Sequence, residues 1–236
     1  MRDFTSRSVE TELMDTEAAD LDEIRPCLRD LAVVNTLTAA RRPTLAWIKK
    51  ATRGFAPGER VSLLDVGFGH GDMLRKIHDW CTAQGFRPDL TGVDLNPWSA
   101  SVAQAATPRG MGLTYVTGDV FAFQPARPVD FIVSSQFTHH LTDGEAAAFI
   151  AWMEQRAVRG WFINDLHRHA LPFYAFRAAA KLAGFHRFVQ YDGPISIARG
   201  FRRDDWNGMV RAAGLEPSAV EVRWWMPFRL CVGRIR

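Results

Sequence analysis

The sequence predicts an α/β fold built on a doubly wound, mostly parallel sheet with an antiparallel hairpin strand at the carboxyl end. Short apolar and β-branched runs alternate with helical stretches from Val61 onward, which is typical of a parallel sheet covered by helices on both faces. No internal repeat interrupts the alternation. The chain ends in two apolar runs around Met226-Pro227, and strands this close in sequence must pair antiparallel.

The amino-terminal region is predicted to be helical and separate from the sheet. Residues 1–20 are polar and acidic without a firm period, so we expect a mobile arm. Apolar residues recur every three or four positions from Leu21 to about Thr52, and Pro43 can open a second helix there. The turn-rich residues 53–60 form a joint. We therefore expect a helical arm or lid at 1–55 and a main domain at 56–236, with a helical insert near 170–200.

The main domain supplies the remaining elements in order. Expected strands begin at Val61, Leu90, Leu113, Asp130 and Gly160. Thr142 and Glu145 have the spacing of a capping box and predict a helix after the fourth strand. Gly214 is expected to end the last helix as its carboxyl cap.

Composition excludes several classes of protein. With 236 residues, 47% of them apolar and 23% charged, the chain resembles an ordinary globular protein. No apolar run approaches the roughly 18–20 residues of a membrane span, and the first residues lack the apolar core of a signal peptide, so we expect a cytoplasmic location. The net charge of +3 is scattered and does not favour nucleic acid. Three distant cysteines indicate reduced thiols.

A glycine-rich loop follows the first strand in LLDVGFGHGD, where Asp65 precedes Gly67, Gly69 and Gly71. Glycines allow the chain to turn sharply and let a ligand lie against the backbone. The triplet alone is equally compatible with a tight turn that binds nothing.

The next two strand ends favour a ligand. Asp94 ends the second strand about 20 residues past the last glycine, where an acid accepts hydrogen bonds from ribose hydroxyls. Asp119 follows the third strand and could accept from an exocyclic amine, with Val120 against a purine face. Three successive strand ends thus carry groups that fit one ligand with a ribose and a purine.

From Val61 onward these motifs resemble those of class I methyltransferases, which depend on S-adenosylmethionine and have a Rossmann-like sheet. The resemblance implies that the glycine loop wraps the methionine part, that Asp94 holds the ribose and that Asp119 touches adenine. It makes a dehydrogenase the weaker interpretation. The implied cofactor-binding residues are Asp65, Gly67, Gly69, Gly71, Asp94, Leu95, Asp119, Val120 and Ser135.

Four histidines follow the fourth and fifth expected strands, in SSQFTHHL and NDLHRH: His139, His140, His167 and His169. Because ligands bind beyond the carboxyl ends of such strands, we expect them to cluster with Asp165 beside the transferable methyl group. Adjacent histidines rarely both reach one ion, so we expect no metal and propose that at least one of the four acts as a base. One of His139 and His140 could instead cap or pack against the following helix.

The runs NDLHRH, DGPISIARGF and DDWNGMVRAAGL resemble bacterial methyltransferases that modify quinones and phenols. The leading hypothesis is therefore O-methylation of a phenolic or quinol-like small molecule, and the expected partner is a small aromatic or quinone-like acceptor. A homodimer stays open, and neither nucleic acid nor stable membrane insertion is expected. The alternatives are C-methylation of an electron-rich ring, a non-catalytic cofactor-binding subunit and an RNA-methylating role. Charged residues of these runs, such as Arg168 and Arg199, could simply buttress loops.

Overall fold

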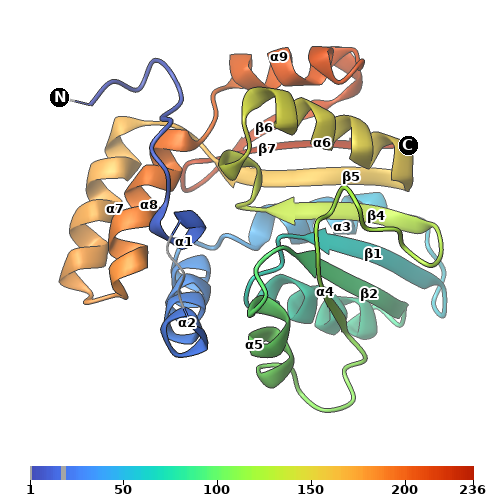
Figure 1. The fold of residues 1–236 in the computed structure, drawn as a ribbon. Helices are drawn as coiled ribbons and strands as arrows, with labels where there is room; N and C mark the ends of the chain where they lie inside the picture. Colours follow the sequence, from blue (N-terminus) through green and yellow to red (C-terminus); the bar gives the residue numbers. More distant parts are fainter. Residues whose placement is uncertain (1, 17–19) are drawn as a thin grey trace.

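The computed structural model describes residues 2–16 and 20–236 and is centred on a seven-stranded sheet (Figure 1). The strands are β1 (Arg60–Val66), β2 (Arg87–Asp94), β3 (Thr114–Thr117), β4 (Val129–Ser135), β5 (Ala157–Leu166), β6 (Glu221–Trp225) and β7 (Arg229–Ile235). Their order is β3-β2-β1-β4-β5-β7-β6. The first five strands are parallel, and β7 pairs antiparallel with both β5 and β6. The predicted fold class, including the antiparallel hairpin, is confirmed.

Helices cover both faces of this sheet. They are α1 (Leu13–Thr16), α2 (Leu21–Leu37), α3 (Arg42–Ala51), α4 (Asp72–Ala83), α5 (Ser99–Ala105), α6 (Asp143–Arg156), α7 (Ala170–Leu182), α8 (Arg187–Arg199) and α9 (Arg203–Ala212). Side chains of α6 and α9 pack into one apolar cluster with the sheet, and side chains of α3 and α4 pack into another. Among the described residues, no helix has the length and apolar character needed to cross a bilayer.

A third group of helices lies over the carboxyl ends of the parallel strands. In Figure 1 the arrowhead of β4 points toward α1, α2, α7 and α8. Buried side chains of α2 and α8 pack together, among them Ile24, Leu28 and Phe188. The helix α3, by contrast, packs directly on the sheet through Trp47 and Ile48. Only α1 and α2 of the amino-terminal helices therefore overhang the strand ends.

The amino-terminal arm is docked where the sequence predicted a mobile segment. Phe4 packs against Phe173 of α7, and Glu12 is almost fully buried. Arg7 donates to the carbonyl oxygens of His139 and Leu141. These contacts follow no sequence period, so the pattern of the arm could not predict them. Residues 1 and 17–19 of the predicted arm lie outside the described residues.

The amino terminus of α6 fixes the segment that carries the two adjacent histidines. Thr142 Oγ1 accepts from Glu145 N at 3.3 Å, and Glu145 Oε2 accepts from Thr142 N at 2.8 Å, which confirms the predicted capping box. We expect Thr142→Ala to lower the free energy of unfolding by roughly 0.5–2 kcal/mol, because one helix N–H loses its acceptor. Urea denaturation measures this change. An unchanged free energy of unfolding would show that the cap contributes nothing.

Candidate functional site

The glycine loop joins β1 to α4 and needs glycine on two grounds. Gly67, Gly69 and Gly71 have φ values of +71°, +50° and +72°, which most residues avoid. A Cβ on Gly71 would also lie 2.7 Å from the hydroxyl oxygen of Tyr115. At Gly69 a Cβ would meet only Leu28 of α2, at 3.9 Å. The loop therefore turns tightly at Gly71 and leaves room for a ligand at Gly69.

Asp94 ties the end of β2 to this loop. Its Oδ2 accepts from Gly69 N at 2.8 Å, and its Oδ1 accepts from Asn96 N at 2.9 Å. Burial raises the pKa of Asp94, although these N–H donors act in the opposite direction. An ionised carboxylate offers about four acceptor positions. The Ser99 side chain also hydrogen-bonds to this carboxylate, so about one position remains for a further donor, such as a ribose hydroxyl.

Asp65 lies below the loop rather than on its surface. The side chain is buried at the end of β1, and burial raises the pKa of its carboxyl well above the usual range. The carboxylates of Asp72 and Asp94 raise it further. Asp65 is therefore more deeply buried than Asp94, which is partly exposed at the end of β2.

The other expected cofactor residues lie at the same edge of the sheet. Leu95 follows β2 and is 73% exposed, whereas Val120, after β3, is buried. Asp119 is exposed, and its Oδ1 accepts from Phe121 N at 3.0 Å. Ser135 ends β4, with its Oγ 3.3 Å from Thr44 Oγ1 of α3. The edge thus presents an acid and an apolar side chain beside each of two strand ends.

A buried histidine–aspartate pair lies at the carboxyl ends of β4 and β5. His139 Nδ1 is 2.7 Å from Asp165 Oδ1, and the His139 backbone N donates to Asp165 Oδ2 at 3.1 Å. Although burial opposes the charge, the His139 interactions outweigh it and lower the pKa of Asp165. An ionised carboxylate only accepts, so we assign a ring proton to Nδ1; in the neutral ring the lone pair is then on Nε2. His139 is thus arranged to accept a proton.

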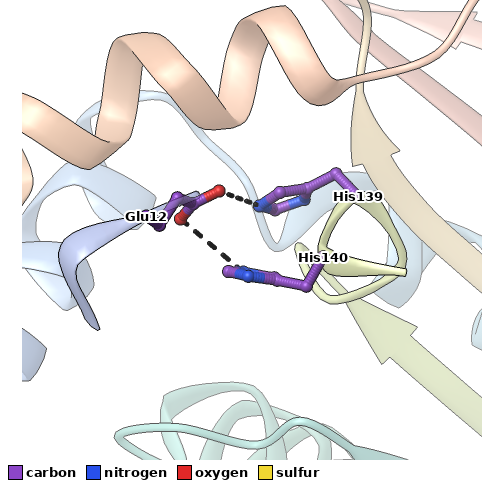
Figure 2. A group of neighbouring side chains, drawn as sticks. All are labelled: Glu12, His139 and His140. Carbon is purple, nitrogen blue, oxygen red and sulfur yellow. Dashed lines mark ion pairs between the residues drawn. The ribbon is translucent and has the colours of Figure 1, made fainter. Parts of the chain in front are cut away.

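The amino-terminal arm brings two carboxylates to the histidines, as Figure 2 shows for Glu12. Glu12 Oε1 lies 3.7 Å from Nε2 of His139, and Glu12 Oε2 lies 3.8 Å from Nε2 of His140. On its other side, His140 Nδ1 is 3.0 Å from Asp15 Oδ2. Sequence reasoning missed Glu12 and Asp15, since nothing in the polar arm distinguishes one acid from another.

The geometry of Glu12, His139 and His140 bears on the question of a metal. Their ligand atoms lie within 4.8 Å of one another, so this group could hold a cation even though the two histidines are adjacent. A proton on His140 can also balance the negative charge of the two carboxylates. Burial lowers the pKa of His140, but Asp15 and Glu12 outweigh it and raise that pKa to about 9. Protonated His140 and Arg199, 3.9 Å from Glu12, then balance the two carboxylates of the arm.

Protonation of His140 is expected to make docking of the arm depend on pH. The groups that face this ring are Glu12 and Asp15 of the arm, Arg199 of α8 and His139. A raised pKa of about 9 means that the ion pairs are complete below the ordinary histidine pKa of about 6.5 and are lost as the pH rises toward 9. We expect the difference in unfolding free energy between the wild type and His140→Gln to shrink across this range. A difference that stays constant with pH would contradict the assignment.

The remaining two histidines form a separate group around Phe228, in the turn between β6 and β7. The ring centroids of His167 and His169 lie 6.3 and 5.3 Å from that of Phe228. His169 is exposed, and its Nδ1 accepts from Leu171 N at the start of α7. The predicted group of four histidines is therefore divided, and His139 is the one paired with Asp165.

Two arginines noted in the sequence buttress the loops. Arg168 is buried and donates to the carbonyl oxygens of Phe4 and Gly200 and to Asp205. Arg199 donates to the carbonyl oxygens of His139 and His140. Their contacts are structural and hold the arm and the histidine segment together.

Comparison with known proteins shows what the central part of the chain is similar to. Residues 63–159 match the family described as "Methyltransferase domain". An uncharacterized methyltransferase of Geobacillus sp. (strain WCH70) is 29% identical over 131 residues, which cover 54% of this chain and 58% of the relative. One of Geobacillus thermodenitrificans (strain NG80-2) is 28% identical over 128 residues, covering 52% of this chain and 56% of the relative. The chain thus matches little more than half the length of these relatives.

Solved structures share the fold at low identity. The plantazolicin methyltransferase BpumL in complex with S-adenosylhomocysteine aligns with a TM-score of 0.65 and 13% identity, covering 91% of this chain and 96% of that one. The mitomycin 7-O-methyltransferase MmcR aligns at 0.64 and 15%, covering 96% and 61%. The magnesium protoporphyrin IX methyltransferase of Synechocystis PCC 6803 aligns at 0.57 and 16%, covering 84% and 83%. At these identities the likeness establishes the fold.

Proposed function

We propose that the protein, whose residues 63–159 match the methyltransferase domain family, binds S-adenosylmethionine and transfers its methyl group to a hydroxyl group of a phenolic or quinol-like small molecule. The observation that supports the proposal best is the position of the His139–Asp165 pair. It lies at the carboxyl ends of β4 and β5, next to an edge where β1, β2 and β3 carry a glycine loop and two acids. Ligands of open α/β sheets bind at this edge.

The cofactor's parts match the groups along the edge. The glycine loop and Ser135 would hold the methionine part, Asp94 would accept from the ribose, and Leu95, Val120 and Asp119 would contact adenine. The charge of His140 lowers the pKa of Asp94, so the histidine segment is within electrostatic reach of the residue that would hold the ribose.

The chemistry needs one proton acceptor and correct positioning. His139 would accept the proton of the acceptor hydroxyl at Nε2, and bound S-adenosylmethionine would supply the methyl group to that oxygen and leave as S-adenosylhomocysteine. Asp165 stabilises the imidazolium that forms and keeps the ring oriented. In-line alignment of oxygen, methyl carbon and sulfur supplies much of the remaining acceleration.

The acceptor class is supported by the surroundings of the pair. The end of β4 and the two residues after it read SSQF and lack the N-P-P-Y type motif of methyltransferases that modify amines in DNA. Helices α1, α2, α7 and α8 overhang the strand ends (Figure 1), and Phe173 and Phe176 of α7 pack into an apolar cluster among them. We propose that α1 and α2, together with the insert near 170–200, act as a lid over a planar acceptor.

Two other functions make different predictions. C-methylation of an electron-rich ring would use the same base to remove a proton from carbon, and a non-catalytic subunit would bind the cofactor without turnover. Incubation with S-adenosylmethionine carrying a ¹³C-labelled methyl group and a panel of catechols, hydroquinones and phenols distinguishes them. We expect a methoxy carbon signal in the product spectrum. A methyl signal on ring carbon would replace the proposal with C-methylation, and binding without product on any acceptor would favour the subunit.

The same assay tests whether a metal takes part. With His139 as base and a proton on His140, we expect turnover to persist in EDTA. Activity that is lost in EDTA and restored by one divalent ion would instead assign Glu12, His139 and His140 to a metal centre.

A further inference from the structure

Arg229 is a buried cation at the ligand edge whose hydrogen bonds are incomplete. The residue opens β7 and is 3% exposed. Its Nη2 donates to Gln136 Oε1 at 3.2 Å and is 3.4 Å from Thr38 Oγ1, whereas the buried Nε and Nη1 have no hydrogen-bond partner. Leaving charged donors without acceptors in the interior costs stability. The usual solution is a carboxylate, which matches the planar guanidinium.

No carboxylate of the described chain supplies this partner. Asp165, on the neighbouring strand, interacts with Arg229 through its charge. However, Asp165 Oδ1 already accepts from His139 Nδ1 and from Leu166 N, and Oδ2 accepts from His139 N. Among residues 2–16 and 20–236, the acceptors that Arg229 does have are neutral oxygens.

The position of Arg229 is that of a ligand contact. It pairs with Leu166, the last residue of β5, and therefore lies at the carboxyl edge of the parallel strands. Its partner Gln136 directly follows β4 and has a φ of +56°, which is uncommon for a residue other than glycine. Gln136 also bonds Asn35 of α2. The amide oxygen of Gln136 thus occupies the place where the guanidinium would favour an anion.

We propose that Arg229 binds a carboxylate of a ligand at this edge, which takes over the contact now made by Gln136. Two sources share this chemistry, the methionyl carboxylate of the cofactor and an acidic group on the acceptor. The inference rests on the proposed binding of S-adenosylmethionine. A carboxylate here would lie next to Gln136, at the neighbouring ends of β4, β5 and β7.

Calorimetry with paired ligands tests the proposal. The probes are S-adenosylhomocysteine and its decarboxylated analogue 5′-(3-aminopropylthio)adenosine, and 3,4-dihydroxybenzoate and catechol in the presence of S-adenosylhomocysteine. Arg229→Gln is compared with the wild type and with Arg223→Gln, a largely exposed arginine on β6. We expect Arg229→Gln to weaken binding of one carboxylate ligand about 10- to 100-fold and to leave its decarboxylated partner unchanged.

The affected pair identifies the source: the first pair indicates the cofactor's carboxylate and the second an acidic acceptor. Equal losses with and without the carboxylate, or no loss in either pair, would overturn the role of Arg229. If Arg229→Gln does not fold, the affinities of the wild type still test the role of Arg229. Equal affinities of the wild type for the two members of each pair would also overturn that role. Failure of the wild type to bind S-adenosylhomocysteine would instead refute the proposed function.

Discussion

Replacement of His139 by alanine is expected to lower kcat by about 10²- to 10⁴-fold while affinity for the cofactor changes little. The expectation follows from the pair with Asp165, which leaves Nε2 of His139 as the proton acceptor. Turnover is measured on an acceptor found by the labelling assay, and cofactor affinity by calorimetry. Asp165→Asn should also reduce kcat, because a neutral amide stabilises the imidazolium less well.

His169→Ala is the matched control for this loss. His169 also follows a strand of the sheet, but it is exposed and caps α7. We expect near-normal turnover from this variant. A His139 variant that folds, binds cofactor and retains normal kcat across a pH series would remove His139 from the role of base.

Asp94→Ala should weaken binding of S-adenosylmethionine by roughly 1–3 kcal/mol, or about 5- to 150-fold, through the loss of charge-assisted hydrogen bonds to the ribose. The substitution also removes the acceptor for Gly69 N, which holds the loop. Asp89→Ala is the control, because Asp89 lies on the same strand and pairs with Arg60 at the surface. Equal affinities of the Asp94 variant and the wild type would remove Asp94 from the ribose role.

Most of the fold could be predicted because its signals are local. The capping box at Thr142 and Glu145 and the glycine at position 214 after α9 are features of short segments, and both are in place. The close spacing of the last two strands permitted only an antiparallel pair. The docking of residues 2–16 was missed because it depends on single contacts of Phe4 and Glu12 with distant elements.

The sequence predicted those parts of the candidate site that lie at the ends of strands. The topology brought Asp94 to the glycine loop and His139 to Asp165, in each case through residues that follow neighbouring strands. Glu12 and Arg229 gave no such signal. Glu12 reaches His139 from an arm without periodicity, and the incomplete hydrogen bonding of Arg229 is a property of the packed interior.

A crystal structure of the complex with S-adenosylhomocysteine tests the central claim most directly. We predict that the ribose hydroxyls hydrogen-bond to Asp94, that the methionine part lies on the loop from Gly67 to Gly71, and that the sulfur faces Nε2 of His139 across the space for the acceptor. A ligand whose ribose lies away from Asp94, or whose sulfur faces away from the His139–Asp165 pair, would contradict the account.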